Sequence, residues 1–327
     1  MISEEDKIMM ETLYWWGIPT LFRCKNDPDP KNCDIALVGV PHSTGNGTTE
    51  RDQHLGPRAV RNISAMLRRS HFDYKIDPWK MKKIHDLGDV PFPEANNNEK
   101  CIERISDFYD QIEKAEKPVV SIGGDHSITG GIVQSLAKKN SKLTKGKKIS
   151  FLHFDAHTDC FEKLDHFLGA KKSAAHWASY LVKQGNVDPH TSTQIGIRGN
   201  PRTLDWLQGS YDNGYQVITM DEYRELGHEK CVKKILDRIG DNPIYVTFDL
   251  DCLDPTVAPG VANIESAYRG FNIDEARKLI QCLKGKNVIG GDVACLMPTK
   301  DNPNQITSMV AAAIMFEIIC LICVKPE

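Results

Sequence analysis

The sequence carries little net charge and has no cysteine spacing typical of a structural zinc site. Its 41 Lys and Arg residues against 44 Asp and Glu residues give a net charge of -3, which argues against electrostatic attraction to nucleic acid or to an anionic membrane. Its ten cysteines are scattered, without paired CxxC motifs. In a chain without an export signal they are most simply reduced thiols, which favours a cytoplasmic enzyme and excludes a disulfide scaffold.

The sequence also lacks internal repeats, low-complexity tracts, an evident linker and a signal peptide. Its first residues, MISEEDKIMM, are acidic and have no basic segment before an apolar core. We therefore expect a single domain over residues 1–327, with residues 1–32 as an N-terminal extension packed on it. The basic segment 138–148 has no interleaved aromatic residues, so we interpret it as a solvated helix end and not as a nucleic-acid site.

One apolar run, residues 306–324, is as long as a membrane span. The run contains Glu317, and Lys325 is the only basic residue that follows as an anchor. An apolar helix of this kind in a large α/β protein is usually buried. We expect a core or subunit-facing helix, and no membrane partner.

Apolar runs rich in β-branched residues alternate with amphipathic segments along the whole chain. We expect strands at 35–40, 83–87, 118–122, 149–154, 193–197, 215–219, 244–249 and 288–293. Helices are expected near 57–69, 99–114, 127–139, 173–184, 202–209, 222–239, 273–284 and 304–323. Because such alternation requires crossover connections, it predicts an α/β fold with a mostly parallel sheet covered on both faces.

Three of the expected strands end in side chains that bind metals. The segments are VVSIGGDHS (119–127), ISFLHFDAHTD (149–159) and IYVTFDLDCLDP (244–255). In open α/β sheets, ligands bind at the carboxyl ends of the strands. The six candidate metal ligands are His126, Asp155, His157, Asp159, Asp249 and Asp251.

The spacing of these residues predicts a site for two cations. Residues i, i+2 and i+4 of an extended chain point the same way, so Asp155, His157 and Asp159 can face one point. Asp249 and Asp251 repeat the spacing. Carboxylates this close repel each other unless a cation lies between them. A mixture of oxygen and imidazole donors favours Mn²⁺, Fe²⁺, Ni²⁺ or Zn²⁺ over Ca²⁺, and two such ions can activate a shared water for hydrolysis.

The motifs GGDHS, DAHTD and DLDCLDP, in this order and spacing, resemble the ureohydrolase family of arginases, agmatinases and amidinohydrolases. Residues 38–61 are similar to that family's N-terminal glycine-rich loop and first helix, and TQIGIRG (193–199) resembles its agmatinase branch. The resemblance implies a three-layer α/β/α fold with an eight-stranded, mostly parallel sheet. It also implies a trimeric or hexameric homo-oligomer and two manganese ions, with nickel or zinc in some members.

The activity that this resemblance implies is hydrolysis of a C–N bond in a guanidino compound similar to agmatine or a guanidino acid, giving urea and an amine. His176 stands where the family carries its proton-shuttle histidine, although the residues alone would predict a packing histidine. Asp159 is expected to accept a proton from the attacking water in addition to binding metal. A general acid in the role implied for His176 contributes about 10²–10⁴-fold to the rate.

The late strand GGDVACLMP departs from the family's pattern, because Cys295 stands where the family has a guanidinium-binding glutamate. A planar guanidinium is best bound by a carboxylate with two oxygens, so another acid has to take this role. Glu265 is one candidate, and Glu50 or Asp52 of the N-terminal loop are others. Asn263 replaces a threonine in the loop of Glu265. We expect Glu265, Asn263 and Cys295 to line the substrate site, with Cys295 as a small buried apolar residue.

This departure leaves three interpretations open. We favour a guanidino substrate that is smaller than arginine or different from it. The second is an amidine substrate of the formimino-glutamate type, which has fewer donors to satisfy and releases formamide in place of urea. The third is a metal-binding paralogue or subunit without activity, against which the six intact ligand positions argue.

Overall fold

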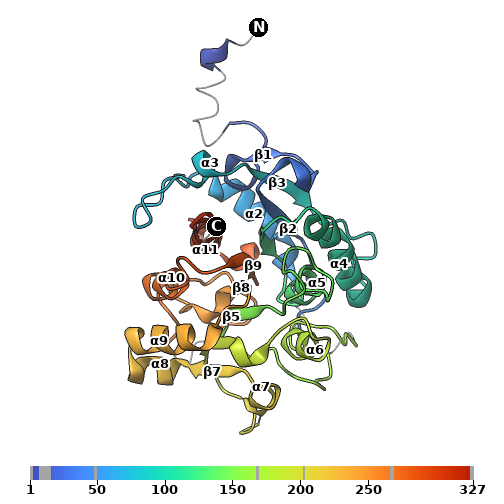
Figure 1. Ribbon diagram of the computed structural model, residues 1–327, viewed down its shortest axis with the longest axis vertical. Helices are drawn as coiled ribbons and strands as arrows, with labels where there is room; N and C mark the ends of the chain where they lie inside the picture. Colours follow the sequence, from blue (N-terminus) through green and yellow to red (C-terminus); the bar gives the residue numbers. More distant parts are fainter. Residues whose placement is uncertain are drawn as a thin grey trace.

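The computed structural model describes residues 3–6, 16–47, 50–166, 169–201, 203–265 and 269–324. Its core is one wholly parallel sheet with helices on both faces (Figure 1), so the predicted three-layer α/β/α arrangement is confirmed. The strands lie in the order β1-β3-β2-β4-β9-β8-β5-β6-β7. Their bounds are β1 Lys25–Asn26, β2 Ile35–Val40, β3 Ile84–Asp89, β4 Val119–Gly123, β5 Ser150–Phe154, β6 Thr193–Ile197, β7 Gln216–Thr219, β8 Ile244–Asp249 and β9 Val288–Ala294.

The prediction of eight strands was wrong by one, because the sheet has nine. The eight predicted strands are all present, with bounds that differ by at most two residues. The additional strand, β1, has two residues, which pair with His85 and Asp86 of β3. Both residues of β1 are exposed, so it has no alternation of apolar and polar residues from which it could be predicted.

The helices follow the predicted order with three departures. A short helix over residues 78–81 was not predicted, the helix expected over 202–209 lies at 208–213, and one predicted helix is divided in two. Their bounds are α2 Gly56–Ser64, α3 Pro78–Met81, α4 Asn98–Lys114, α5 Ile128–Leu136, α6 Trp177–Lys183, α7 Gln208–Asn213, α8 Met220–Leu226, α9 His228–Ile239, α10 Ile273–Gln281 and α11 Ile306–Cys323. Short 3-10 turns lie at η1 Leu21–Arg23, η2 Pro30–Asn32, η3 Asp52–Leu55, η4 Pro189–Thr191, η5 Leu250–Cys252 and η6 Pro298–Lys300. The single helix expected over 222–239 is divided at Gly227, whose φ of +80° ends α8.

The central strands present their side chains alternately to two apolar cores, one on each face of the sheet. In β8, Val246 and Phe248 pack in the core that contains residues of α2, α8, α9, α10 and α11. Tyr245, which precedes Val246 in the strand, packs in the core that contains residues of α4, α5 and α6. Because both faces are covered, the central strands are buried along their length and most of their side chains are apolar, as in parallel strands generally.

Part of the predicted extension packs on the sheet. Leu21 and Phe22 are buried in the core beside α2. The backbone N–H of Leu21 donates to Asp86 Oδ2 at 2.9 Å, and that of Phe22 donates to Ser64 Oγ at 2.9 Å. Residues 1–2 and 7–15 of this segment lie outside the described residues, so an extension over 1–32 on a single domain stays a prediction.

Helix α11 is long and apolar enough to cross a membrane, and 78% of it is buried inside the protein. It packs against β9, α2 and α10. Its one charged residue, Glu317, is buried and lies 3.0 Å from His71 Nε2. Glu317 also accepts hydrogen bonds from Arg277 Nε at 2.6 Å and from Gln281 Nε2 at 3.1 Å. These contacts join α10 and the loop before α3 to the C-terminal helix.

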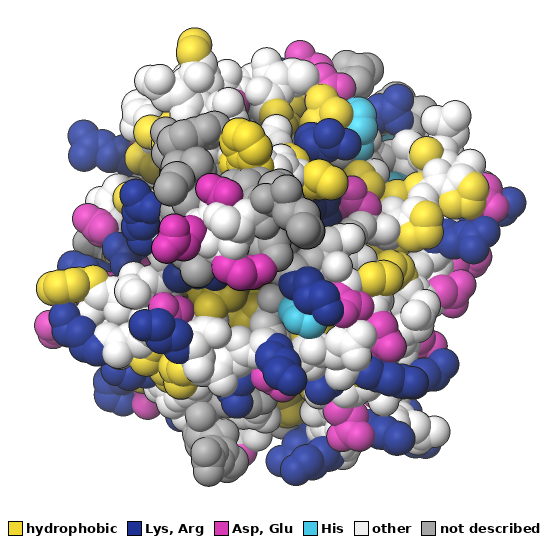
Figure 2. All heavy atoms as spheres, turned by 90° about the horizontal axis from the view of Figure 1, so that it is seen from above, with side chains coloured by type: hydrophobic (Ala, Val, Ile, Leu, Met, Phe, Trp, Pro, Cys, Tyr) yellow, Lys and Arg dark blue, Asp and Glu magenta, His cyan; other side chains and the backbone are white. Residues whose placement is uncertain are grey.

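Acidic and basic side chains are interspersed on the face shown in Figure 2, with small groups of apolar side chains between them. Exposed side chains of opposite charge also form ion pairs, as Lys233 and Asp237 do at 2.5 Å. The face in Figure 2 therefore has no continuous basic surface among its described residues.

Replacing Glu317 with leucine should lower the free energy of unfolding by about 1–3 kcal/mol, because His71 and Arg277 lose a buried partner. The change can be measured from urea unfolding followed by circular dichroism. The control is Asp237→Asn, which removes an exposed ion pair and should cost less than about 0.5 kcal/mol. Equal shifts of the unfolding midpoint in both variants would contradict the role assigned to Glu317.

Candidate metal centre

The loops after β4, β5 and β8 bring the six predicted metal ligands together at the carboxyl edge of the sheet. β9 lies between β4 and β8, and β8 pairs directly with β5, so the three loops meet near the middle of the sheet. Five of the six residues are less than a tenth exposed, and His157 is partly exposed. The buried residues are His126, Asp155, Asp159, Asp249 and Asp251.

The first group of donors surrounds Nδ1 of His126. This atom lies 2.9 Å from Asp155 Oδ2, 3.0 Å from Asp159 Oδ2 and 3.2 Å from Asp249 Oδ2. Nδ1 has no hydrogen-bond partner among the described residues. A buried nitrogen that faces three carboxylate oxygens in this way has the surroundings of a metal ligand.

The second group of donors surrounds Nδ1 of His157. This atom lies 3.3 Å from Asp155 Oδ1 and 3.2 Å from Asp251 Oδ2. Asp155 therefore gives Oδ2 to the first group and Oδ1 to the second. A carboxylate shared in this way can bridge two ions, which fits the two-metal site that the sequence predicts.

The tautomer of His126 is determined by residues on β8 and β9. Asp292, which is fully buried, accepts hydrogen bonds from Tyr245 OH at 2.8 Å, Thr129 Oγ1 at 3.0 Å and Thr247 Oγ1 at 2.8 Å. Since Thr247 gives its one proton to Asp292, its oxygen has to accept the bond of 2.8 Å from His126 Nε2. Nε2 therefore carries a proton, and Nδ1 is the nitrogen left for a metal.

Burial and the repulsion between carboxylates shift the pKa values of several of these groups. Burial and the charge of Asp249 raise the pKa of Asp251 well above its usual value. Burial and the charge of Asp155 raise the pKa of Asp159 in the same way. For His126, burial lowers the pKa, but the carboxylates around it outweigh burial and raise it well above its usual value. Positive charge is what these residues require, and divalent ions provide it.

Two backbone positions in the loops that carry the predicted ligands, Asp159 and Gly124, are sterically restricted. Asp159 has a φ of +49°, a left-handed conformation that aspartate tolerates better than most residues. Its Oδ2 accepts a hydrogen bond of 2.8 Å from Trp177 Nε1. Gly124, in GGDHS, packs so closely on the end of β2 that a Cβ there would lie 2.4 Å from the carbonyl oxygen of His42. This position therefore requires glycine.

The three residues expected at the substrate lie on two sides of this centre. Oε1 of Glu265 lies 3.3 Å from His157 Nε2, the nitrogen that points away from the donor group. Asn263 is half-buried in the same loop. Cys295 follows β9 with a φ of +68°, and its N–H donates to the carbonyl oxygen of Gly124 at 2.8 Å. Burial and the charges of Asp249 and Asp251 raise the pKa of its thiol well above the usual value.

His176 lies just before α6 and is buried. Its Nε2 accepts a hydrogen bond of 3.3 Å from the N–H of Leu164, so Nδ1 carries the proton and donates to Ser173 Oγ at 2.7 Å. Burial lowers the pKa of His176. The next residue, Trp177, donates a hydrogen bond to Asp159, so His176 is one residue from a side chain that contacts a predicted metal ligand. A role in proton transfer stays a prediction.

The two other acids considered for the guanidinium already have partners. Glu50 forms an ion pair with Lys300, and Asp52 Oδ2 accepts a hydrogen bond of 3.0 Å from Thr299 Oγ1. Both partners belong to the turn η6. These contacts join the loop after β2 to the loop after β9.

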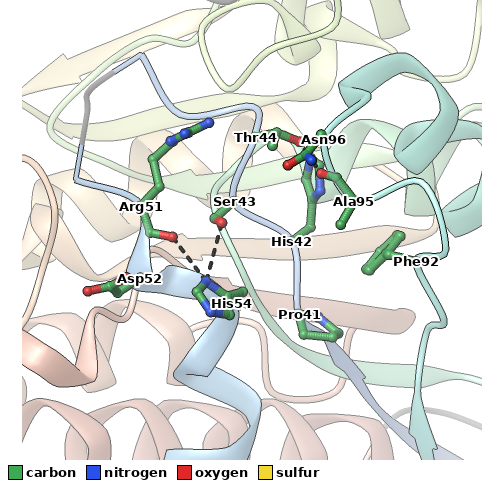
Figure 3. A pocket seen from close by; sticks show the side chains of 10 residues that line it. All are labelled: Pro41, His42, Ser43, Thr44, Arg51, Asp52, His54, Phe92, Ala95 and Asn96. Atoms are coloured by element: carbon green, nitrogen blue, oxygen red, sulfur yellow. Dashed lines mark hydrogen bonds between the residues drawn. The ribbon is translucent and has the colours of Figure 1, made fainter.

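A pocket of about 390 Å³ lies where the loop after β2 meets residues 92–96 (Figure 3). Ser43 Oγ lies 3.4 Å from His54 Nδ1 on one side, and Phe92 lines the other. None of the six predicted metal ligands lines this pocket. The loop after β2 also contacts the segment that carries His126, because the N–H of Gly45 donates to Asp125 Oδ2 at 2.8 Å.

Several functional positions were missed from the sequence. His153, whose Nε2 lies 2.9 Å from Asp155 Oδ2, belongs to the first donor group. It precedes Asp155 by two residues on β5, so the period of two that identified the ligands would also have identified it. Arg198 is buried and donates to the carbonyl oxygens of Asp251 at 2.7 Å and Glu265 at 3.3 Å. No pattern along the chain predicts that contact.

Comparison with known proteins gives matches over nearly the whole chain. The Arginase family matches residues 33–321. A guanidinopropionase of Pseudomonas aeruginosa is 33% identical over 308 residues, covering 94% of this chain and 92% of the relative. An agmatinase of Salmonella paratyphi B is 30% identical over 294 residues, covering 89% of this chain and 88% of the relative.

Among solved structures, the proclavaminate amidino hydrolase of Streptomyces clavuligerus superposes with a TM-score of 0.85 at 27% identity, covering 95% of this chain and 99% of that one. The parallel sheet and the donor groups at its edge agree with these matches. The chain belongs to the arginase family.

Proposed function

We propose that this protein hydrolyses a C–N bond of a guanidino compound, giving urea and an amine, at a centre of two divalent ions. The observation that carries the proposal is the pair of donor groups around His126 and His157, which share Asp155. Relatives named guanidinopropionase and agmatinase support a guanidino substrate. The six residues fit the ions, because their carboxylates need counter-charge and Nδ1 of His126 has no hydrogen-bond partner in the part of the chain that the structure describes.

The residues around the centre have separate tasks in this reaction. When bound, two divalent ions lower the pKa of a water so that it can attack at neutral pH. Asp159 is oriented by Trp177 and accepts the proton that this water loses. A new C–O bond forms at the guanidino carbon and the C–N bond to the amine breaks. His176 supplies the proton that the leaving amine needs.

Glu265 is the acid best placed to meet the guanidinium at the open side of the centre. Its side chain is partly exposed, and so is the His157 ring that it contacts. The alternatives Glu50 and Asp52 are engaged by η6. Cys295 leaves the β9 side of the site neutral, because its buried thiol is protonated. This favours a guanidino compound that is smaller than arginine or different from it.

We further propose manganese as the metal, with nickel or zinc as alternatives, since carboxylate and imidazole donors suit all three. A cytoplasmic location is supported by ten unpaired cysteines. A homo-oligomer, a trimer or hexamer, is proposed from the family resemblance of the motifs. Size-exclusion chromatography with light scattering tests the last point.

Urea release from a substrate panel tests the proposed reaction. The purified chain, stripped with chelator and reloaded with Mn²⁺ or Ni²⁺, should release urea from at least one of guanidine, guanidinopropionate, guanidinobutyrate, agmatine and arginine. The stripped protein should release none, because the attacking water is then not activated. Consumption of formimino-glutamate without urea from any guanidino compound would replace the proposal with the amidine reaction. Two bound metals without any turnover would favour a non-catalytic subunit.

The matched variants for this test are Asp251→Asn and Asp254→Asn. Asp251 lies 3.2 Å from His157 Nδ1, whereas Asp254, three residues later, accepts bonds from Thr256. Asp251→Asn should reduce turnover by about 10²-fold or more through loss of a metal ligand. Asp254→Asn should leave both metal content and turnover close to those of the wild type.

The His176→Ala variant should lower kcat by about 10²-fold or more while retaining both metals, because the leaving amine loses its proton donor. Turnover is measured by urea release and metal content by atomic emission. His190→Ala, which changes an exposed histidine, is the control. Normal turnover with normal metal content in His176→Ala would rule out the proton-transfer role.

The Cys295→Ala variant should change kcat by less than about threefold, because a buried thiol with a raised pKa is a poor nucleophile. The metal-loaded wild type should likewise resist inactivation by iodoacetamide. A large loss of kcat in the variant would assign the thiol a direct role. A rise in KM alone would assign it to substrate binding.

A further inference from the structure

We propose that His153 and Gln194, which are not metal ligands, form a hydrogen-bonded pair that holds Asp155, the carboxylate shared by the two donor groups. The inference rests on the metal centre proposed above and concerns how that centre is built. Both residues are fully buried and lie on the neighbouring strands β5 and β6. They are direct partners in the register of these strands, His153 opposite Gln194.

The orientation of the Gln194 amide follows from its contact with a backbone carbonyl. Its Nε2 lies 2.6 Å from the carbonyl oxygen of Thr158. A carbonyl oxygen only accepts, so the atom facing it has to be the NH₂ group of the amide. The same Nε2 lies 3.1 Å from Nδ1 of His153. Gln194 therefore has one N–H for each of the two acceptors.

This orientation determines where His153 carries its proton. Because Gln194 donates to Nδ1, that nitrogen is unprotonated, and the ring proton is on Nε2. Nε2 lies 2.9 Å from Asp155 Oδ2 and donates to it. Hydrogen bonds thus run from the Gln194 amide through the His153 ring to the shared carboxylate.

The same contacts argue against His153 as a ligand, although it lies within the first donor group. Metal binding through Nε2 would move the ring proton to Nδ1. Nδ1–H would then face the N–H of Gln194, with two donors opposed and no acceptor between them. The amide cannot turn to relieve this, because Thr158 needs its NH₂ group. His153 is therefore a positioning residue.

The His153 ring packs against two other buried rings. The ring of His153 lies 4.8 Å from that of Trp177 and 5.2 Å from that of His126, measured between centroids. A hydrogen bond to Oδ2 from this packed ring orients the Asp155 carboxylate, whose Oδ1 faces the second donor group. Outer hydrogen-bond partners of this kind typically contribute about 10–100-fold to metal affinity.

The experiment titrates the metal-free full-length protein with Mn²⁺ by calorimetry, with bound metal counted by atomic emission. His153→Leu, which removes the donor, should weaken at least one of two sites by about 10–100-fold. His153→Gln, which returns an N–H near the position of Nε2, should recover most of the affinity. Gln194→Met, which leaves His153 in place but releases its tautomer, should weaken binding to a smaller extent.

Two further variants separate positioning from a general loss of stability. His71→Leu removes another buried histidine, one that contacts Glu317, and should leave Mn²⁺ affinity unchanged. If Gln194 acts through His153, the double variant His153→Leu with Gln194→Met should bind Mn²⁺ no more weakly than His153→Leu alone.

Each contrary result has a distinct meaning. Wild-type affinity in His153→Leu, or equally weak binding in His153→Gln, would overturn the donor role of the pair. Weakening by His71→Leu to the same degree would also overturn it. Absence of Mn²⁺, Ni²⁺ and Zn²⁺ binding by the wild type would overturn the metal centre itself, and the inference with it. Should His153→Leu fail to fold, wild-type affinity in Gln194→Met is sufficient to overturn the inference.

Discussion

The structure depends above all on the crowding of four carboxylates at one edge of a buried sheet. Asp155, Asp159, Asp249 and Asp251 lie within reach of two histidines, in surroundings from which water is largely excluded. Their mutual repulsion destabilises the folded chain unless cations or protonated histidines balance it. Metal binding at such a cluster would be coupled to folding and to the release of protons from these groups.

The predicted ligand side chains contact outer partners that come from two strands, a helix and a loop. Thr247 fixes the tautomer of His126, and Glu265 contacts the outer nitrogen of His157. His153 donates to Asp155, and Trp177 donates to Asp159. The geometry of the donor groups is thus determined by folding before any ion binds, which lowers the entropic cost of binding.

Patterns of short range could be read from the sequence, whereas contacts between strands could not. The period of two in DAHTD and DLD identified the ligands, and continuous apolar runs identified eight strands. β1 was missed because its two exposed residues have no such pattern. Gln194 stands 41 positions from His153 and joins it only through the pairing of β5 with β6. The role of Glu265 as a neighbour of His157 depended in the same way on a fold that brings distant loops together.

Arg198 binds the backbone of the long segment that follows β8 at two places. Its guanidinium holds the carbonyl oxygens of Asp251, Cys252 and Leu253 at the start of this segment, and that of Glu265 near its middle. The backbone is anchored at these two points, and the residues between them are held at both ends. Insertions or substitutions in that interval can therefore change the loop that carries Asn263 while Asp251 keeps its position.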